Sequence, residues 1–178
     1  FCTNPGIIIG LESKELTVFT EVLGKEIRKI APGTMLDSGI FKNYRKKKDD
    51  ATKQKGVEVV AFSETKPLLN QGSPTIATAT GQDFLANPLL QQEVFGPYSL
   101  IIRCKDMKEM LNVANNLEGQ LTATLMATEN DIRIHEKIVD AVSNICGRFI
   151  LNNVPTGVEV CLSMQHGGPY PSTTDSRF

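Results

Sequence analysis

The sequence predicts an α/β fold in which a mostly parallel sheet carries helices on both faces. Two patterns indicate it. Short apolar or alternating segments of strand length recur along the chain, and between them apolar residues return every three or four positions, as in amphipathic helices. Strands that alternate with helices of about a dozen residues form βαβ units, whose strands run parallel. With 178 residues, the chain is long enough for a domain of ordinary size with a continuous core.

The chain opens with a strand followed by a helix. The apolar, β-branched segment 7–11 has the length and composition of a buried strand. Apolar residues then recur at helical spacing over 16–30, which predicts an amphipathic helix. Ser13 suits its N-cap, and Pro32-Gly33 ends it.

A second helix and two strands come next. Asp37 or Ser38 is the expected N-cap of a helix that reaches about Gln54. The segment 57–62 then has strand character, and 75–80 alternates apolar residues with threonines, as a strand does. The stretch between these two strands is rich in Ser, Pro, Gly and Asn, which predicts a surface loop.

The remaining elements alternate in the same way. We expect one helical turn at 83–87, and then strands and helices in turn over 98–103, 107–117, 121–127, 134–145 and 149–151. His135 falls inside the last of these helices and is expected to be a surface or half-buried side chain. The final segment 152–178 is rich in Gly and Pro and is expected to run irregularly over the surface, where long loops are often functional.

Composition narrows the function classes. The 19 basic and 20 acidic side chains give a net charge of −1, which argues against a dedicated nucleic-acid binder. No apolar run approaches the ~20 residues that span a bilayer, so we expect no membrane partner. The four cysteines are far apart and form no C-x-x-C pair, which argues against a zinc site and a disulfide scaffold. A reducing, cytoplasmic location follows, with Cys104 and Cys146 as small buried hydrophobes.

Cys2 has different surroundings. It precedes the turn-forming segment 3–6 and then a strand, so its thiol would stand beside backbone N–H groups that can stabilise an oxyanion. This geometry suits a nucleophile, although most cysteines are simply buried. His166 or His135 could activate the thiol, as in a Cys–His hydrolase.

Two further segments carry weaker signals. Gln92–Pro97 places an acidic residue two positions before an aromatic one and a Gly-Pro turn, which could recognise hydroxyl groups or only end a helix before a strand. The basic run that begins at Arg45 is followed at once by two aspartates, so a solvated helix face is favoured over a phosphate site. No G-x-G-x-x-G or Walker motif occurs.

Taken together, these segments resemble the aldehyde dehydrogenase superfamily. The resemblance runs in order over essentially the whole chain. It is carried by Phe1–Gly6, Glu93–Pro97, Gly119–Leu125, Asn152–Cys161 and His166–Pro171. The last two segments resemble the branch that contains α-ketoglutaric semialdehyde dehydrogenases and NADP-dependent fatty aldehyde dehydrogenases.

The resemblance implies a fold, a reaction and roles for single residues. Residues 1–178 would form the three-layer catalytic domain of the family. Cys2 would attack an aldehyde, form a thiohemiacetal and then a thioester, and release a carboxylic acid. Glu93 would accept hydrogen bonds from the nicotinamide ribose of NADP or NAD, and Phe95 would pack beside that ribose and ring. His166 would border the substrate entrance, and the parent enzyme would be a homo-oligomer, a dimer or tetramer.

Departures from the family pattern matter as well. The family's oxyanion asparagine, its general-base glutamate and its dinucleotide-binding domain all precede the catalytic cysteine, and its C-terminal continuation would follow Phe178. We therefore expect a catalytic domain cut from a longer enzyme, inactive as the isolated chain. Two alternatives remain open: a Cys–His hydrolase or acyltransferase that uses Cys2 and His166, and a non-catalytic assembly domain with the same fold.

Overall fold

The computed structural model describes residues 4–155, 162 and 166–174. The chain forms two compact units, residues 1–110 and 111–178. Helix α4 (Met107–Asn115) crosses the boundary between them.

The first unit is built on a four-stranded sheet with the order β1-β6-β5-β3. The central strands β5 and β6 pair in parallel, as do β6 and β1, whereas β3 runs antiparallel to β5 at one edge. The four strands are β1 (Ile7–Leu11), β3 (Glu58–Phe62), β5 (Thr75–Thr80) and β6 (Tyr98–Cys104). The mostly parallel sheet predicted from the sequence is therefore confirmed.

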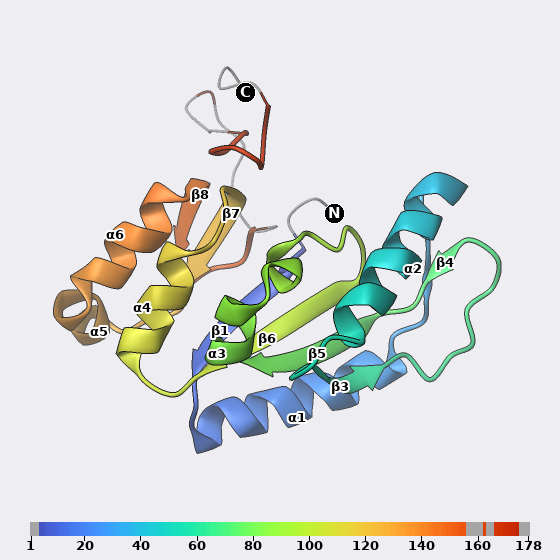
Figure 1. Cartoon of the computed structure of the whole chain (residues 1–178), viewed down its shortest axis with the longest axis horizontal. Coiled ribbons are helices and arrows are strands. Elements are labelled where there is room, and N and C mark those ends of the chain that lie inside the picture. Colours follow the sequence, from blue (N-terminus) through green and yellow to red (C-terminus); the bar gives the residue numbers. More distant parts are fainter. Residues whose placement is uncertain (1–3, 156–161, 163–165, 175–178) are drawn as a thin grey trace. The chain divides into compact units, whose positions relative to one another are not determined.

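Helices cover this sheet on both faces (Figure 1). Helix α1 packs along β3 and β5, and α3 packs against β5 and β6 from the other side. The helices of this unit are α1 (Lys14–Lys29), α2 (Ser38–Thr52), α3 (Gly81–Ala86) and the 3-10 helix η1 (Pro88–Gln91). The predicted caps are confirmed, because Ser13 accepts from the Leu16 amide and Asp37 caps α2.

The core of this unit lies on the two central strands. Both faces of β5 and β6 are buried apart from Thr80 and Arg103. The largest fully buried side chains of the unit are Tyr44, Phe84, Leu100, Ile101, Ile102 and Cys104. Each large aliphatic or aromatic side chain buried in this way contributes about 1.5–3 kcal/mol to folding.

Two differences from prediction occur in this unit. The expected surface loop before Thr75 contains a two-residue strand, β4 (Gln71–Gly72), which pairs with β2 (Gly33–Thr34). Helix α3 begins earlier than the predicted turn, because the Thr80 hydroxyl caps it by accepting from the Asp83 amide.

The second unit holds a parallel pair of strands and two short helices. Strand β7 (Gln120–Leu125) pairs with β8 (Cys146–Leu151), and α6 (Glu136–Asn144) packs against both. The sequence predicted one helix over 134–145, but a separate helix α5 (Glu129–Ile134) precedes α6.

The cause of this second helix is local. Thr128 and Asp131 form a reciprocal capping box that starts α5. His135 then has φ −117° and ψ 40°, outside the helical region, so the two helices are separate. His135 is half-buried, as expected, but lies between helices rather than inside one. Cys146 is also half-buried, which corrects its expected burial, whereas Cys104 is buried.

The C-terminal segment approaches the starts of β7 and β8 very closely. A Cβ atom added to Gly147 would lie 1.6 Å from the Gly167 carbonyl oxygen, and one added to Gly119 would lie 2.0 Å from the Pro169 carbonyl oxygen. Only glycine permits such backbone contact. At the other end of the strands, the Asn152 side-chain amide donates to the Ala127 carbonyl at 2.9 Å and accepts from the Ala127 amide at 2.9 Å.

Candidate functional site

The described residues that follow Cys2 are bound to the start of β6. The Ser99 hydroxyl donates to the Pro5 carbonyl at 2.5 Å, and the Leu100 amide donates to the Gly6 carbonyl at 2.9 Å. Cys2 itself lies outside the described residues. Pro5 and Gly6 are therefore fixed beside the strand that follows Glu93–Pro97.

The two sequence segments also meet through Asn4. Its side-chain amide donates to the Gly96 carbonyl at 3.3 Å, so residues 92 positions apart in sequence are in contact. Glu93 and Phe95 lie between η1 and β6 in a stretch without regular secondary structure, and both side chains are exposed. The Phe95 side chain retains 43% of its accessible surface, so its ring is open to a ligand.

Helix α2 supports this stretch through Tyr44. The Tyr44 side chain is 1% exposed, and its hydroxyl donates to the Ser73 carbonyl at 2.6 Å, with the Pro97 carbonyl at 3.3 Å. Gly96 has a φ of +148°, and a Cβ atom there would lie 2.4 Å from the Tyr44 ring. Gly96 is therefore required both by its backbone conformation and by the ring against it. Burial raises the pKa of the Tyr44 phenol far above its usual range.

Tyr98 is the second buried tyrosine beside this stretch. Its side chain is 4% exposed, and burial raises its pKa to about 12. Among the described residues, no group lies within hydrogen-bond distance of its hydroxyl.

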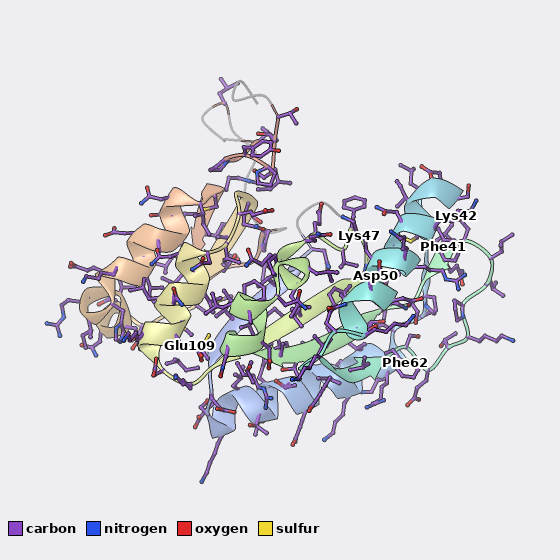
Figure 2. All side chains as sticks on the ribbon, viewed as in Figure 1. Phe41, Lys42, Lys47, Asp50, Phe62 and Glu109 are labelled. Atoms are coloured by element: carbon purple, nitrogen blue, oxygen red, sulfur yellow. The ribbon has the colours of Figure 1, made fainter. Side chains whose placement is uncertain are left out.

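A second residue of α2 reaches the backbone of the same stretch. The Lys47 ammonium donates to the Glu93 carbonyl at 3.0 Å. Lys47 follows Tyr44 by one helical turn, so both project from the same face of α2. Figure 2 shows Lys47 and Asp50 on the stretch of α2 between Lys42 and the end of the helix.

The exposed Glu93 carboxylate and Phe95 ring could each contact a ligand. An ionised carboxylate only accepts hydrogen bonds and can take two at once, so the exposed Glu93 suits a diol such as a ribose. An exposed aromatic ring two residues away offers a flat apolar surface. In the parts of the chain that the structure describes, no three His, Cys, Asp or Glu side chains lie close enough together to hold a metal ion.

Comparison with known sequences identifies the family. The sequence model of the aldehyde dehydrogenase family matches residues 17–177.

The chain belongs to the aldehyde dehydrogenase family.

Its relatives in the family agree with this assignment. The chain is 38% identical over 175 residues to alpha-ketoglutaric semialdehyde dehydrogenase 2 of Azospirillum brasilense, covering 98% of this chain and 33% of that protein. It is 39% identical over 178 residues to alpha-ketoglutaric semialdehyde dehydrogenase of Acinetobacter baylyi, covering 99% and 34%. The chain thus spans about a third of the length of these curated relatives.

The fold is shared with solved members of the family. The structure of succinic semialdehyde dehydrogenase from Streptococcus pyogenes in complex with NADP+ matches with a TM-score of 0.70 and 22% identity, over 94% of this chain and 37% of that one. The expected α/β fold of the aldehyde dehydrogenase type is therefore confirmed. Among helices of the described residues, none has both the length and the hydropathy that a membrane span requires.

The structure describes some of the residues that the family resemblance singles out and not others. Glu93 and Phe95 are exposed and directly precede Gly96, whose carbonyl accepts a hydrogen bond from Asn4, and their predicted role in cofactor binding stays a prediction. His166 is exposed and belongs to the second unit. The segment 156–161, which carries part of the branch resemblance, lies outside the described residues.

The two described cysteines are not activated nucleophiles. Cys104 is fully buried, and burial raises the pKa of its thiol to about 12. Burial also raises the pKa of Cys146. A reactive thiol needs a lowered pKa and exposure, and neither Cys104 nor Cys146 has both.

Sequence reasoning missed the supporting residues of α2. The sequence pattern does not single out Tyr44, and it places Lys47 in the basic run for which a solvated helix face is favoured. One signal was available, because a tyrosine and a lysine at i and i+3 share a helix face. Which loop that face meets depends on tertiary packing, which the sequence pattern does not encode.

Proposed function

We propose that this chain is the nucleophile-bearing catalytic part, over residues 1–178, of a longer NAD(P)-dependent aldehyde dehydrogenase that oxidises a semialdehyde to a carboxylic acid. One observation carries the proposal. The residues that follow Cys2 are hydrogen-bonded to the backbone directly after Glu93 and Phe95. The relatives named as alpha-ketoglutaric semialdehyde dehydrogenases support an α-keto semialdehyde as substrate, with a long-chain aldehyde as the second class.

Cys2 performs the covalent step. Its thiolate adds to the aldehyde carbon and forms a thiohemiacetal, whose oxyanion accepts a hydrogen bond from the Cys2 backbone N–H. When bound, a nicotinamide would supply the acceptor for the hydride that leaves this carbon. The resulting thioester on Cys2 is then hydrolysed, which consumes one water, releases the carboxylic acid and regenerates the thiol.

Glu93 and Phe95 bind the cofactor. The Glu93 carboxylate would accept hydrogen bonds from the two hydroxyls of the nicotinamide ribose. The exposed Phe95 ring would pack beside the ribose and the nicotinamide. Neither contact separates NAD from NADP, because those cofactors differ at the other ribose.

The remaining machinery comes from outside these residues. The general base, the oxyanion asparagine and the dinucleotide-binding domain belong to preceding sequence in the family, so we propose that the isolated chain does not oxidise aldehydes. We further propose a homo-oligomeric enzyme with the cytoplasm as its location, because its four widely spaced cysteines do not resemble a disulfide scaffold. His166 borders the substrate entrance in this scheme.

The test compares Cys2→Ala with Cys146→Ala in the complete enzyme. Aldehyde-dependent formation of reduced nicotinamide is expected to fall by at least about a thousandfold in Cys2→Ala, the loss typical of a missing nucleophile. Cys146→Ala is expected to stay near wild-type activity. Retained turnover in Cys2→Ala would place the nucleophile elsewhere. Ester hydrolysis that needs no nicotinamide but is lost in His166→Ala would favour the Cys–His hydrolase instead.

A further inference from the structure

The backbone that carries Glu93 and Phe95 has few hydrogen bonds of its own. The Gln92 amide donates to Leu89 at 3.2 Å, and the Gly96 carbonyl accepts from the Tyr98 amide at 2.8 Å. Between described residues, one hydrogen bond to residues 93–95 is found, the bond from the Lys47 ammonium to the Glu93 carbonyl.

Lys47 is placed for this single contact. Its side chain is half-buried, and it forms no ion pair with a described carboxylate, whereas Lys46 on the same helix lies 4.0 Å from Asp50. A charged donor to a carbonyl forms a shorter and stronger bond than a neutral one. The 3.0 Å contact therefore fixes the Glu93 backbone to the rigid surface of α2.

The other end of the stretch is held independently. Tyr44, one turn earlier on α2, packs its ring against Gly96 and places its hydroxyl near the Pro97 carbonyl. A small cavity of about 30 Å³, lined by Lys47, Asp50, Leu89, Gln92 and Val94, lies against the nearer end. The space beside Val94 leaves room for residues 93–95 to shift, and Lys47 supplies the hydrogen bond to them that is found among the described residues.

We propose that Lys47 is a positioning residue for cofactor binding: by holding the Glu93 carbonyl, it fixes the Glu93 carboxylate and the Phe95 ring in the orientation that binds the nicotinamide ribose. The inference rests on the proposed function, because it takes Glu93 and Phe95 as the cofactor-binding pair. Lys47 touches neither cofactor nor substrate, and its effect is on affinity for the cofactor rather than on the covalent step at Cys2.

The first measurement concerns the backbone alone. Order parameters from ¹⁵N relaxation of the 178-residue chain report motion of individual amides without any ligand. In Lys47→Met, the values for Val94 and Phe95 are expected to drop from the rigid range near 0.85 toward about 0.6. Lys42→Met is the matched control, since Lys42 is exposed on the same helix and bonds to no described residue.

The second measurement concerns the cofactor. In the complete enzyme, Lys47→Met is expected to raise the Kd and KM for NAD(P) about tenfold, the loss of one charge-assisted contact, and to leave kcat at saturating cofactor within about twofold. Lys42→Met is expected to leave both unchanged. Lys47→Arg keeps a cationic donor and is expected to recover most of the affinity, which a general loss of folding would not allow.

Unchanged order parameters in Lys47→Met overturn the proposal, as does loosened backbone with unchanged cofactor affinity. A complete enzyme that binds no nicotinamide nucleotide refutes the proposed function itself. The two failures are distinguishable, because the relaxation experiment measures the hold of Lys47 on residues 93–95 whether or not a cofactor binds.

Discussion

The contact between Gly96 and Tyr44 supports the sharpest stability prediction. In Gly96→Ala, the new methyl group would lie 2.4 Å from one atom of the Tyr44 ring and 2.9 Å from the next. Neither partner has an easy escape, because Tyr44 is 1% exposed and its hydroxyl is bonded to Ser73. Overpacking of this kind costs about 1–3 kcal/mol, and an alanine at a φ of +148° adds about 1–3 kcal/mol of backbone strain.

We therefore expect Gly96→Ala to lower the free energy of unfolding by about 2–6 kcal/mol. Gly6→Ala is the control, because no atom lies within 4 Å of a Cβ added there. Urea unfolding can be followed by near-ultraviolet circular dichroism of tyrosine, since the chain has no tryptophan and Tyr44 and Tyr98 are buried in the first unit.

The double variant Tyr44→Ala/Gly96→Ala tests whether contact with the Tyr44 ring causes this loss of stability. With Tyr44→Ala, the methyl group at position 96 has room, so the additional cost of Gly96→Ala should shrink to the backbone strain. The coupling free energy between the two positions is expected to be about 1–3 kcal/mol. A Gly96→Ala variant within about 0.5 kcal/mol of Gly6→Ala, or a coupling near zero, would refute the reasoning.

Three further outcomes are expected. The folded pKa of Tyr98 is about 12, above its unfolded value near 10, so the folded state keeps a proton that the unfolded chain loses and stability falls as pH rises from about 10 to 12. Tyr98→Phe should make this fall smaller in alkaline urea titrations, where the raised pKa values of Tyr44 and Cys104 leave the remainder, and should be neutral or stabilising at pH 7. Thr128→Ala should remove the cap of α5 at about 1 kcal/mol, seen as faster amide exchange over Glu129–Ile134; equal exchange would contradict the capping box. Gly147→Ala should displace the segment that carries Gly167, whose carbonyl would lie 1.6 Å from the new methyl group, and increase proteolysis within 166–174, whereas Gly33→Ala, with open space around it, should not.

Residue patterns predicted most elements because local and tertiary preferences agree in them. Ser13 and Asp37 cap the helices for which they were expected, and the buried strands 75–80 and 98–103 were recognisable from apolar or alternating residues. Helix α5 was not predicted as a separate helix because its apolar residues lack a clear helical spacing. Its start is marked instead by polar residues, the capping box of Thr128 and Asp131. The pairing of β2 with β4 involves two residues on each side, too short for any periodic pattern.

In the candidate site, some residues could be predicted from the sequence and others could not. Glu93 and Phe95 were predicted as site residues because they belong to a sequence motif, and the segment after them lies beside residues 4–7 through the parallel register of Ile7 with Leu100. Tyr44 and Lys47 carry no motif. Their role depends on where α2 lies against the stretch before β6, a contact made by side chains distant in sequence, so the structure was needed to find it.

The hydrogen bonds that join Asn4 and Pro5 to Gly96 and Ser99 also constrain how members of this family can be recombined. A chimera that takes residues 4–7 from one enzyme and residues 93–100 from another would combine two segments that are hydrogen-bonded to each other here. A crossover point within α1 separates these two segments, whereas exchanging both segments together keeps these hydrogen bonds within one parent.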